Sequence, residues 1–266
     1  MTVSEGAPNA AELKACCATA YQNDAVALIL GESYHPGGLA LTRRLAQTLD
    51  LRRGERVLDV ASGPGATAFL LASEFGVRVD GVDLGDGSVA AANATAAERG
   101  LAEQVQFHLG DAERIPLPDS SVDAIVCECA FCTFPDKATA AAEMARVLRP
   151  GGRVGITDVA LDPGRLDAEL QTLAGWVACM ADARPVAEYV ELLAGAGLTV
   201  TRTEPHDDAL AEMVTQIDGR LRAFRLAKVP ALESIDFDTA LERVAAAERA
   251  VREEIAGYSL LVATKA

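Results

Sequence analysis

The chain has 266 residues, of which 50% are hydrophobic, and a formal net charge of −15 at pH 7. This length suits one α/β domain with additions, or two small domains. The acidic balance and the lack of a Lys/Arg cluster argue against a nucleic-acid substrate and against an anionic membrane surface. No basic leader precedes an apolar core, and no apolar stretch is long enough to cross a bilayer, so we expect a cytoplasmic protein whose six cysteines start reduced.

The first fifty residues contain no expected strand. The Ala-rich stretch 10–30 predicts one helix, which carries Cys16 and Cys17 and ends at Gly31. A turn containing His35 follows, and residues 39–49 predict a second helix. We therefore treat residues 1–50 as a helical unit that precedes the core.

Short apolar runs and helical patterns then alternate. Strands are expected at residues 56–60, 77–82, 105–109, 122–127 and 153–159, and helices at 66–75, 88–99 and 138–148. Asp86 or Ser88 is expected to cap the helix at 88–99. Such alternation predicts a doubly wound α/β fold, with a parallel sheet covered by helices on both faces.

After residue 159 the pattern changes to a long connection over 160–185. A helix is expected at 186–196, a strand at 198–204, two amphipathic helices at 207–229 and 237–255, and a last strand at 258–264. The predicted divisions are the helical unit 1–50, the core 51–204, a helical insert 205–257 and the last core strand 258–266.

The turn after the first core strand has the features of a cofactor site. Asp59 lies near the end of a buried strand, and Ala61-Ser62-Gly63-Pro64-Gly65 leads into a helix. Glycines let the backbone approach a ligand, and the free N–H groups of a helix N-terminus point at it. Asp83 ends the next strand, where a carboxylate accepts from ribose hydroxyls. A dinucleotide fingerprint would have a third glycine where this chain has Ala68.

Residues 49–158 resemble a class I S-adenosylmethionine (SAM) methyltransferase. The motifs, in order, are the turn at 59–65, Asp83, Gly110-Asp111-Ala112 after the third strand, and Leu148-Arg149-Pro150-Gly151-Gly152 before the fifth. The resemblance implies a Rossmann-like, mostly parallel seven-stranded sheet with strands six and seven antiparallel at one edge. It also implies an N-terminal helical lid over the SAM pocket.

The resemblance further implies the cofactor contacts. Asp59 and the glycine turn would hold the amino-acid end of SAM, Asp83 the ribose hydroxyls, and Asp111 the adenine amino group. The full set of cofactor-binding residues that we predict lies at the carboxyl ends of strands: Asp59, Ala61, Gly63, Gly65, Asp83, Leu84, Asp111, Ala112 and Cys127. For Cys127, plain core packing is the alternative.

The cysteines extend the resemblance to arsenite methyltransferases. Cys127-Glu128-Cys129-Ala130-Phe131-Cys132, followed by Pro135-Asp136-Lys137, matches their stretch after the fourth strand, and Trp176-Val177-Ala178-Cys179 matches a second segment. Trivalent arsenic is soft, and thiolates are its natural ligands. We therefore predict Cys129 and Cys179 as metalloid ligands, with Cys16 or Cys17 closing from the lid.

The match has departures. Glu128 stands where the family has Asn, Ala181-Asp182-Ala183 replaces a glycine pair, and a further N-terminal cysteine has no counterpart.

Three functions remain open at this point. The first is a SAM-dependent methyltransferase of a small thiophilic acceptor, with trivalent arsenic foremost. The second is a SAM-dependent methyltransferase of an organic small molecule, in which the cysteines pack in the core and His35 or Glu128 acts as a base. The third is a non-catalytic thiol–metal binding protein on the same scaffold. A structural zinc site is less favoured, because the cysteine run lacks the usual C-x₂-C pairs.

Overall fold

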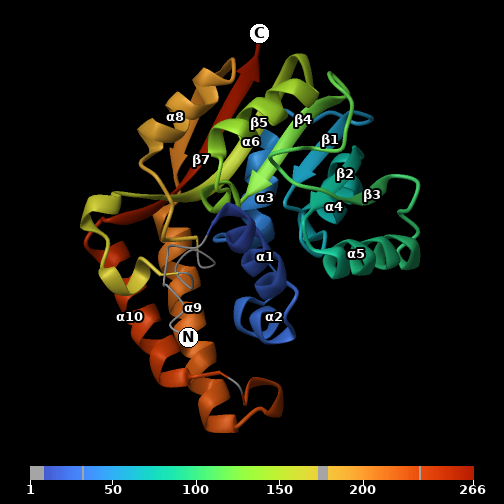
Figure 1. The fold of residues 1–266 in the computed structure, drawn as a ribbon. Helices are drawn as coiled ribbons and strands as arrows, with labels where there is room; N and C mark the ends of the chain where they lie inside the picture. Colours follow the sequence, from blue (N-terminus) through green and yellow to red (C-terminus); the bar gives the residue numbers. More distant parts are fainter. Residues whose placement is uncertain (1–8, 32, 173–178, 234) are drawn as a thin grey trace, which may run out of the picture.

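The computed structural model describes residues 9–31, 33–172, 179–233 and 235–266. At its centre is a seven-stranded sheet of order β3-β2-β1-β4-β5-β7-β6 (Figure 1). The strands are β1 Arg56–Val60, β2 Arg78–Asp83, β3 Val105–Leu109, β4 Val122–Glu128, β5 Leu148–Leu161, β6 Leu198–Pro205 and β7 Ala256–Lys265. The strand order reverses between β1 and β4, which is where doubly wound sheets bind their ligands.

Strand pairing confirms the predicted architecture. β1 pairs in parallel with β2 and β4, and β2–β3 and β4–β5 are parallel as well. β7 lies antiparallel between β5 and β6. The sheet is therefore Rossmann-like and mostly parallel, and its one antiparallel strand comes last in the chain.

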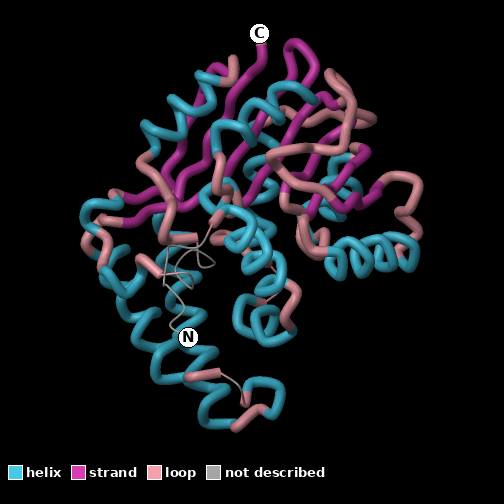
Figure 2. The backbone as a smooth tube through the Cα atoms, viewed as in Figure 1, coloured by secondary structure: helices cyan, strands magenta, loops and turns pink. Residues whose placement is uncertain are grey.

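Helices cover both faces of the sheet (Figure 2). Successive residues of a strand point to opposite faces, so Val57 and Leu58 of β1 pack in different core clusters, and both are fully buried. The cluster that contains Val57 includes residues of α3 Gly38–Thr48, α4 Ala66–Leu70 and α5 Asp86–Glu98. The cluster that contains Leu58 includes residues of α6 Lys137–Val147 and α8 Val186–Gly195.

The N-terminal segment forms two helices, α1 Ala10–Tyr21 and α2 Asp24–Leu30, in place of the single helix predicted over 10–30. That prediction is wrong because Asn23 acts as an N-cap, with its side chain accepting from the N–H of Ala25 at 2.8 Å. Figure 1 shows α1 and α2 at the end of the sheet to which β1 and β4 point.

The two helices before the last strand are α9 Asp207–Ala227 and α10 Phe237–Arg252. They lie side by side and extend away from the sheet (Figures 1 and 2). Arg220 of α9 donates to the carbonyl oxygens of Ile29 at 2.9 Å and Leu30 at 2.6 Å. The insert therefore holds the C-terminal end of α2.

Smaller differences from the predicted elements have local causes. The α5 helix begins at Asp86 behind Gly85, and no side chain caps it, so the predicted cap by Asp86 or Ser88 is wrong. The α4 helix continues as a π turn, η1 Leu71–Phe75. Short 3₁₀ turns complete the described helices: η2 Phe131–Thr133, η3 Pro163–Arg165, η4 Ala168–Leu170 and η5 Pro230–Leu232.

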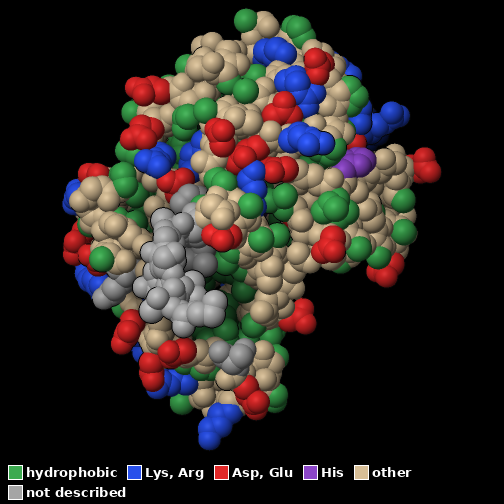
Figure 3. Space-filling view, viewed as in Figure 1, with side chains coloured by type: hydrophobic (Ala, Val, Ile, Leu, Met, Phe, Trp, Pro, Cys, Tyr) green, Lys and Arg blue, Asp and Glu red, His purple; other side chains and the backbone are tan. Residues whose placement is uncertain are grey.

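Charge is spread over the surface. On the face in Figure 3, acidic side chains lie over both the sheet region and the lower helices, with Lys and Arg interspersed. Within the described residues, no helix is both long enough and apolar enough to cross a membrane.

Candidate functional site

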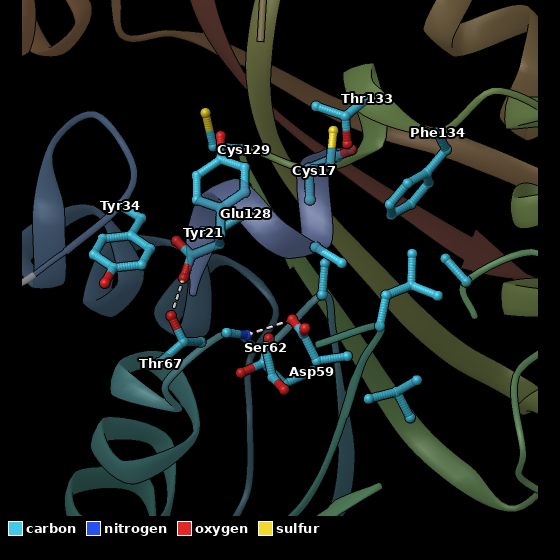
Figure 4. Close-up of a pocket in the computed structure, with 18 of the residues that line it drawn as sticks. Cys17, Tyr21, Tyr34, Asp59, Ser62, Thr67, Glu128, Cys129, Thr133 and Phe134 are labelled. Carbon is cyan, nitrogen blue, oxygen red and sulfur yellow. Dashed lines mark hydrogen bonds between the residues drawn. The ribbon is translucent and has the colours of Figure 1, made fainter. Parts of the chain in front are cut away.

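A pocket opens at the carboxyl ends of the parallel strands, next to α1 (Figure 4). Its sheet side includes seven of the predicted cofactor residues: Asp59, Ala61, Gly63, Asp83, Leu84, Asp111 and Ala112. The N-terminal segment supplies the facing wall, which consists of Lys14, Cys17, Ala18, Tyr21, Ser33, Tyr34 and His35. Residues from distant parts of the chain thus enclose one space.

Asp59 lines this pocket and is only 2% exposed. Its Oδ2 atom is buried and has no hydrogen-bond partner. Burial raises the pKa of the Asp59 carboxyl well above its usual range, and the charges of Glu128 and Asp83 raise it further. A buried carboxylate oxygen without a partner requires a cation or a donor, and the ammonium of the SAM amino-acid end fits that requirement.

The carboxylate of Asp83 is oriented by the backbone. The N–H of Gly63 donates to Oδ2 and the N–H of Gly85 to Oδ1, each at 2.8 Å. Burial raises the pKa of Asp83 against the effect of these hydrogen bonds. A Cβ atom at Gly63 would meet nothing within 4 Å, so this side of the turn is open to a ligand.

Gly65 does not line the pocket. It adopts φ +88° as the N-cap residue of α4, and a Cβ atom there would come within 2.5 Å of Cζ of Phe107. Its role is therefore to let the turn pack against Phe107 in a backbone conformation that glycine tolerates best.

Asp111 lies where the adenine contact was predicted, and it also meets α1. The ammonium of Lys14 donates to Oδ2 of Asp111 at 2.7 Å and to Oε2 of Glu113 at 2.5 Å. These bonds anchor α1 to the pocket wall that follows β3.

Glu128 ends β4, and its side chain is 4% exposed. The hydroxyls of Thr67 and Thr42 donate to Oε2 at 2.6 and 3.0 Å, and the Thr67 bond is drawn in Figure 4. Nε2 of His35 lies 3.6 Å from the same oxygen. The two residues predicted as a candidate base are thus neighbours.

The structure brings four of the six cysteines together. Cys132 and Cys179 are buried in the same core cluster, Cys129 packs against it, and Cys17 of α1 is near enough to Cys179 for their charges to interact. Sγ of Cys179 donates to the carbonyl oxygen of Cys129 at 3.2 Å. Oη of Tyr21 lies 3.7 Å from Sγ of Cys179. We call Cys129, Cys132 and Cys179 the thiol cluster.

The pKa values of the three thiols in the thiol cluster are shifted in different directions. Hydrogen bonds from Cys129 and Cys132 hold the pKa of Cys179 well below its usual range, against the effect of burial. The pKa of Cys129 is raised by its bond to Cys179 and by burial, and that of Cys132 by burial and then by Cys179. Of the three thiols, Cys179 is the one whose deprotonation the surroundings favour. Burial raises the pKa of Cys17 to about 12.

The remaining cysteines lie elsewhere. Cys127 is fully buried in the core cluster beside α6 and does not line the pocket, in contrast to its predicted place in the cofactor set. Cys16 is half-buried and also does not line the pocket. Cys179 is buried behind Cys129, and Trp176 lies outside the described residues.

The thiol cluster does not have the geometry of a preformed metal site. Within the described parts of the chain, no three His, Cys, Asp or Glu side chains are already positioned to hold a metal ion. Sγ of Cys179 donates to the carbonyl oxygen of Cys129, so a shared ligand would have to replace that bond.

A buried ion pair joins the two loops that carry the thiol cluster. Lys137 pairs with Asp182, which also pairs with Arg184, and Nζ of Lys137 donates to the carbonyl oxygen of Phe134 at 3.1 Å. Asp182, one of the departures from the arsenite methyltransferase pattern, thereby ties the Cys179 loop to the segment after Cys132.

Three non-glycine residues here have left-handed backbones, namely Ala61 (φ 59°), Cys129 (φ 52°) and Cys179 (φ 61°). This conformation costs about 1–2 kcal/mol for a residue with a Cβ atom. The N–H of Cys129 donates to the carbonyl oxygen of Thr157 at 2.7 Å, which helps to hold it there.

Lys14 and Tyr21 were missed from the sequence. Together with Cys17 they are spaced by three and then four residues, so they share one face of α1. That spacing could have predicted a shared helix face from the sequence. The residues that contact this face lie in loops distant in the chain, and local sequence patterns do not predict which loops come together.

The chain was compared with known proteins. Residues 58–156 match the family described as "Methyltransferase domain". The 27-O-demethylrifamycin SV methyltransferase of Amycolatopsis mediterranei is 32% identical over 232 residues, which span 85% of this chain and 82% of that protein. An arsenite methyltransferase of Halobacterium salinarum is 35% identical over 161 residues, which span 59% of this chain and only 40% of that protein.

Solved structures share the fold. A putative sarcosine dimethylglycine methyltransferase from Galdieria sulphuraria superposes with a TM-score of 0.78 at 24% identity, covering 86% of this chain and 85% of that one. A Haemonchus contortus phosphoethanolamine N-methyltransferase 2, solved with SAM, has a TM-score of 0.76 at 20% identity, covering 93% of this chain and 57% of that one. The sequence matches, the sheet order and a pocket suited to SAM agree, and the chain belongs to the class I SAM-dependent methyltransferases.

Proposed function

We propose that this enzyme methylates trivalent arsenic, or a similar thiophilic acceptor, held by Cys129 and Cys179. The observation that carries the proposal is the convergence of the thiol cluster, in which segments 50 residues apart place Sγ of Cys179 3.2 Å from the carbonyl oxygen of Cys129. Cys129 also lines the cofactor pocket, so an acceptor on its sulfur would face SAM.

The chain's residues divide the work between two ends of the pocket. Asp59 and the Gly63 turn would hold the amino-acid end of SAM, while Asp83 and Asp111 would receive its ribose and adenine. When bound, SAM supplies a sulfonium methyl whose C–S bond breaks as the arsenic lone pair forms the As–C bond, leaving the bond's electron pair on sulfur in S-adenosylhomocysteine. The lone pair is itself the nucleophile, so the protein's task is to align the acceptor and exclude water.

We also propose that residues 1–50 act as a lid and that the enzyme works in the cytoplasm, where its thiols stay reduced. The pocket-facing residues of α1 and the Lys14–Asp111 bond support the lid role. A lid that releases Asp111 would let SAM enter and then close over both substrates.

A single-turnover experiment tests the proposal. The protein is mixed with SAM, arsenite and excess small thiol, and arsenic species and S-adenosylhomocysteine are followed by mass spectrometry. We expect methylated arsenic to appear in step with S-adenosylhomocysteine. The double variant Cys129→Ser/Cys179→Ser should lose this product but still bind SAM, and Cys16→Ser is the matched control because Cys16 does not line the pocket.

An organic acceptor is the second candidate, and the Glu128–His35 pair favours it. A buried carboxylate 3.6 Å from an imidazole in the pocket wall suits removal of a proton from a hydroxyl or amine. The Amycolatopsis relative is a methyltransferase named for 27-O-demethylrifamycin SV, an organic acceptor. SAM that binds but is not consumed with arsenite, together with an unchanged rate on an organic acceptor in the double cysteine variant, would favour this candidate.

A further inference from the structure

We propose that Cys132, rather than a cysteine of the N-terminal helix, supplies the third thiolate for the arsenic that Cys129 and Cys179 hold. This assignment rests on the function proposed above. It departs from the sequence-based prediction, in which Cys16 or Cys17 closes the site from the lid.

The backbone places Cys132 beside Cys129. Cys132 lies three residues after Cys129, within the 3₁₀ turn η2, which begins after Ala130. The N–H of Cys132 donates to Oδ2 of Asp158 at 2.9 Å, and the N–H of Thr133 donates to the carbonyl oxygen of Ala130 at 2.9 Å. Cys132 is therefore held at a fixed position on the rigid core.

Cys132 and Cys179 are buried in the same core cluster, and Cys129 packs against it. Cys132 is also close enough to Cys179 to lower the pKa of its thiol. Cys132 is 1% exposed and Cys179 4%, so the three sulfurs lie together out of water. A central arsenic atom would join the three sulfurs through As–S bonds in place of their present packing contacts.

Cys17 is a weaker candidate for the third arsenic ligand than Cys132. It interacts with Cys179 through charge, and its thiol lines the cofactor pocket on α1, where Figure 4 draws it on the helix that crosses the cavity. A ligand on a mobile lid would be lost each time α1 moves to admit SAM. Three ligands on the core keep the acceptor bound through lid opening.

The exchange of ligands balances without oxidation. Arsenous acid, As(OH)₃, loses three As–O bonds and gains three As–S bonds, and each thiol proton leaves with a hydroxyl as water. Where Cys179 is already a thiolate, the proton for that water comes from solvent. Arsenic stays trivalent throughout, and its lone pair remains available. Phenylarsine oxide carries one As–C bond, so it accepts only two thiolates.

This difference in valence gives the test. Arsenite and phenylarsine oxide are bound to the full chain, to Cys132→Ser and to the control Cys17→Ser, and sulfur ligands are counted by X-ray absorption at the arsenic edge. We expect three sulfurs in the wild type and in Cys17→Ser, and two in Cys132→Ser. Arsenite should bind Cys132→Ser at least about tenfold more weakly, a change of about 1.4 kcal/mol, while phenylarsine oxide affinity stays within about twofold.

Retained phenylarsine oxide binding shows that Cys132→Ser has folded, and Cys132→Ala repeats the measurement with no hydroxyl. Three sulfurs in both Cys132 variants, or a lost sulfur in Cys17→Ser, would overturn the assignment of Cys132 and leave the proposed function standing. Loss of phenylarsine oxide binding in both Cys132 variants would also overturn it, because Cys132 would then belong to the primary pair. Absence of sulfur-bound arsenic in the wild type would instead refute the proposed function.

Discussion

Replacing Gly65 by alanine should destabilise the protein through two separable effects. The first is the left-handed backbone, φ +88°, which costs a residue with a Cβ atom about 1–2 kcal/mol. The second is steric, because the new methyl would come within 2.5 Å of Cζ of Phe107 and 3.0 Å of Cε2 of Phe69. Overpacking of this kind costs about 1–3 kcal/mol.

Little room exists for Phe107 to move away. Its ring packs edge-on against Phe69 with centroids 5.6 Å apart, and its backbone N–H and carbonyl oxygen both bond to the side chain of Asn93. We therefore expect the two effects to add, giving a loss of about 2–5 kcal/mol in the free energy of unfolding. That is a large share of the roughly 5–15 kcal/mol that holds a typical domain folded.

Urea unfolding followed by far-UV circular dichroism measures this loss. Gly54→Ala is the matched control, since Gly54 has φ +86° and nothing within 4 Å of the added methyl, so it reports the backbone effect alone. The difference between the two variants gives the steric effect, which Phe107→Leu should relieve in the double variant. Equal losses in Gly65→Ala and Gly54→Ala, within about 0.5 kcal/mol, would refute this account of the turn.

Further predictions concern other parts of the molecule. Cys127→Ala should lower the free energy of unfolding by roughly 1 kcal/mol through a small cavity, and calorimetry should find SAM affinity unchanged within about twofold; a larger loss would return Cys127 to the cofactor site. Arg220→Ala removes both bonds to the carbonyl oxygens of Ile29 and Leu30, so amide hydrogen exchange in α2 should speed up by about tenfold, and an unchanged rate would mean that α9 does not support α2. For Asp80, burial alone would raise the pKa, but hydrogen bonds from His108 and Arg56 outweigh it and hold the pKa below its usual range. Its stabilising contribution is present above the unfolded value of about 4 and is lost as pH falls through the folded value, so the stability gap between wild type and Asp80→Asn should narrow from about pH 5 to pH 3. A gap that widens on acidification would contradict that sign.

Much of the core could be predicted because its signals are local. Arg56–Val60 and Val105–Leu109 were placed to the residue, since a buried parallel strand is a short apolar run bounded by turn residues. The break at Asn23 was missed because an Ala-rich stretch hides a cap that only its hydrogen bond reveals.

Part of the candidate site could also be predicted, because some of its residues belong to local sequence motifs. Glycine and aspartate positions at strand ends follow from the fold, so Asp59, Asp83 and Asp111 were found from the sequence. The partners of these residues were not. The Lys14–Asp111 and Lys137–Asp182 bonds join segments that are far apart in the chain, and no periodicity records which loops meet.

The left-handed backbones at Cys129 and Cys179 have a consequence for how the sequence can change. Glycine would adopt these conformations at little cost, so a substitution to glycine at either position relieves about 1–2 kcal/mol of backbone strain while removing a sulfur. A library of variants sorted only for folded, soluble protein should therefore tolerate or even enrich glycine at 129 and 179. The proposed function predicts that sorting the same library for arsenite binding recovers cysteine, and the two outcomes would separate what the fold prefers from what the proposed chemistry requires.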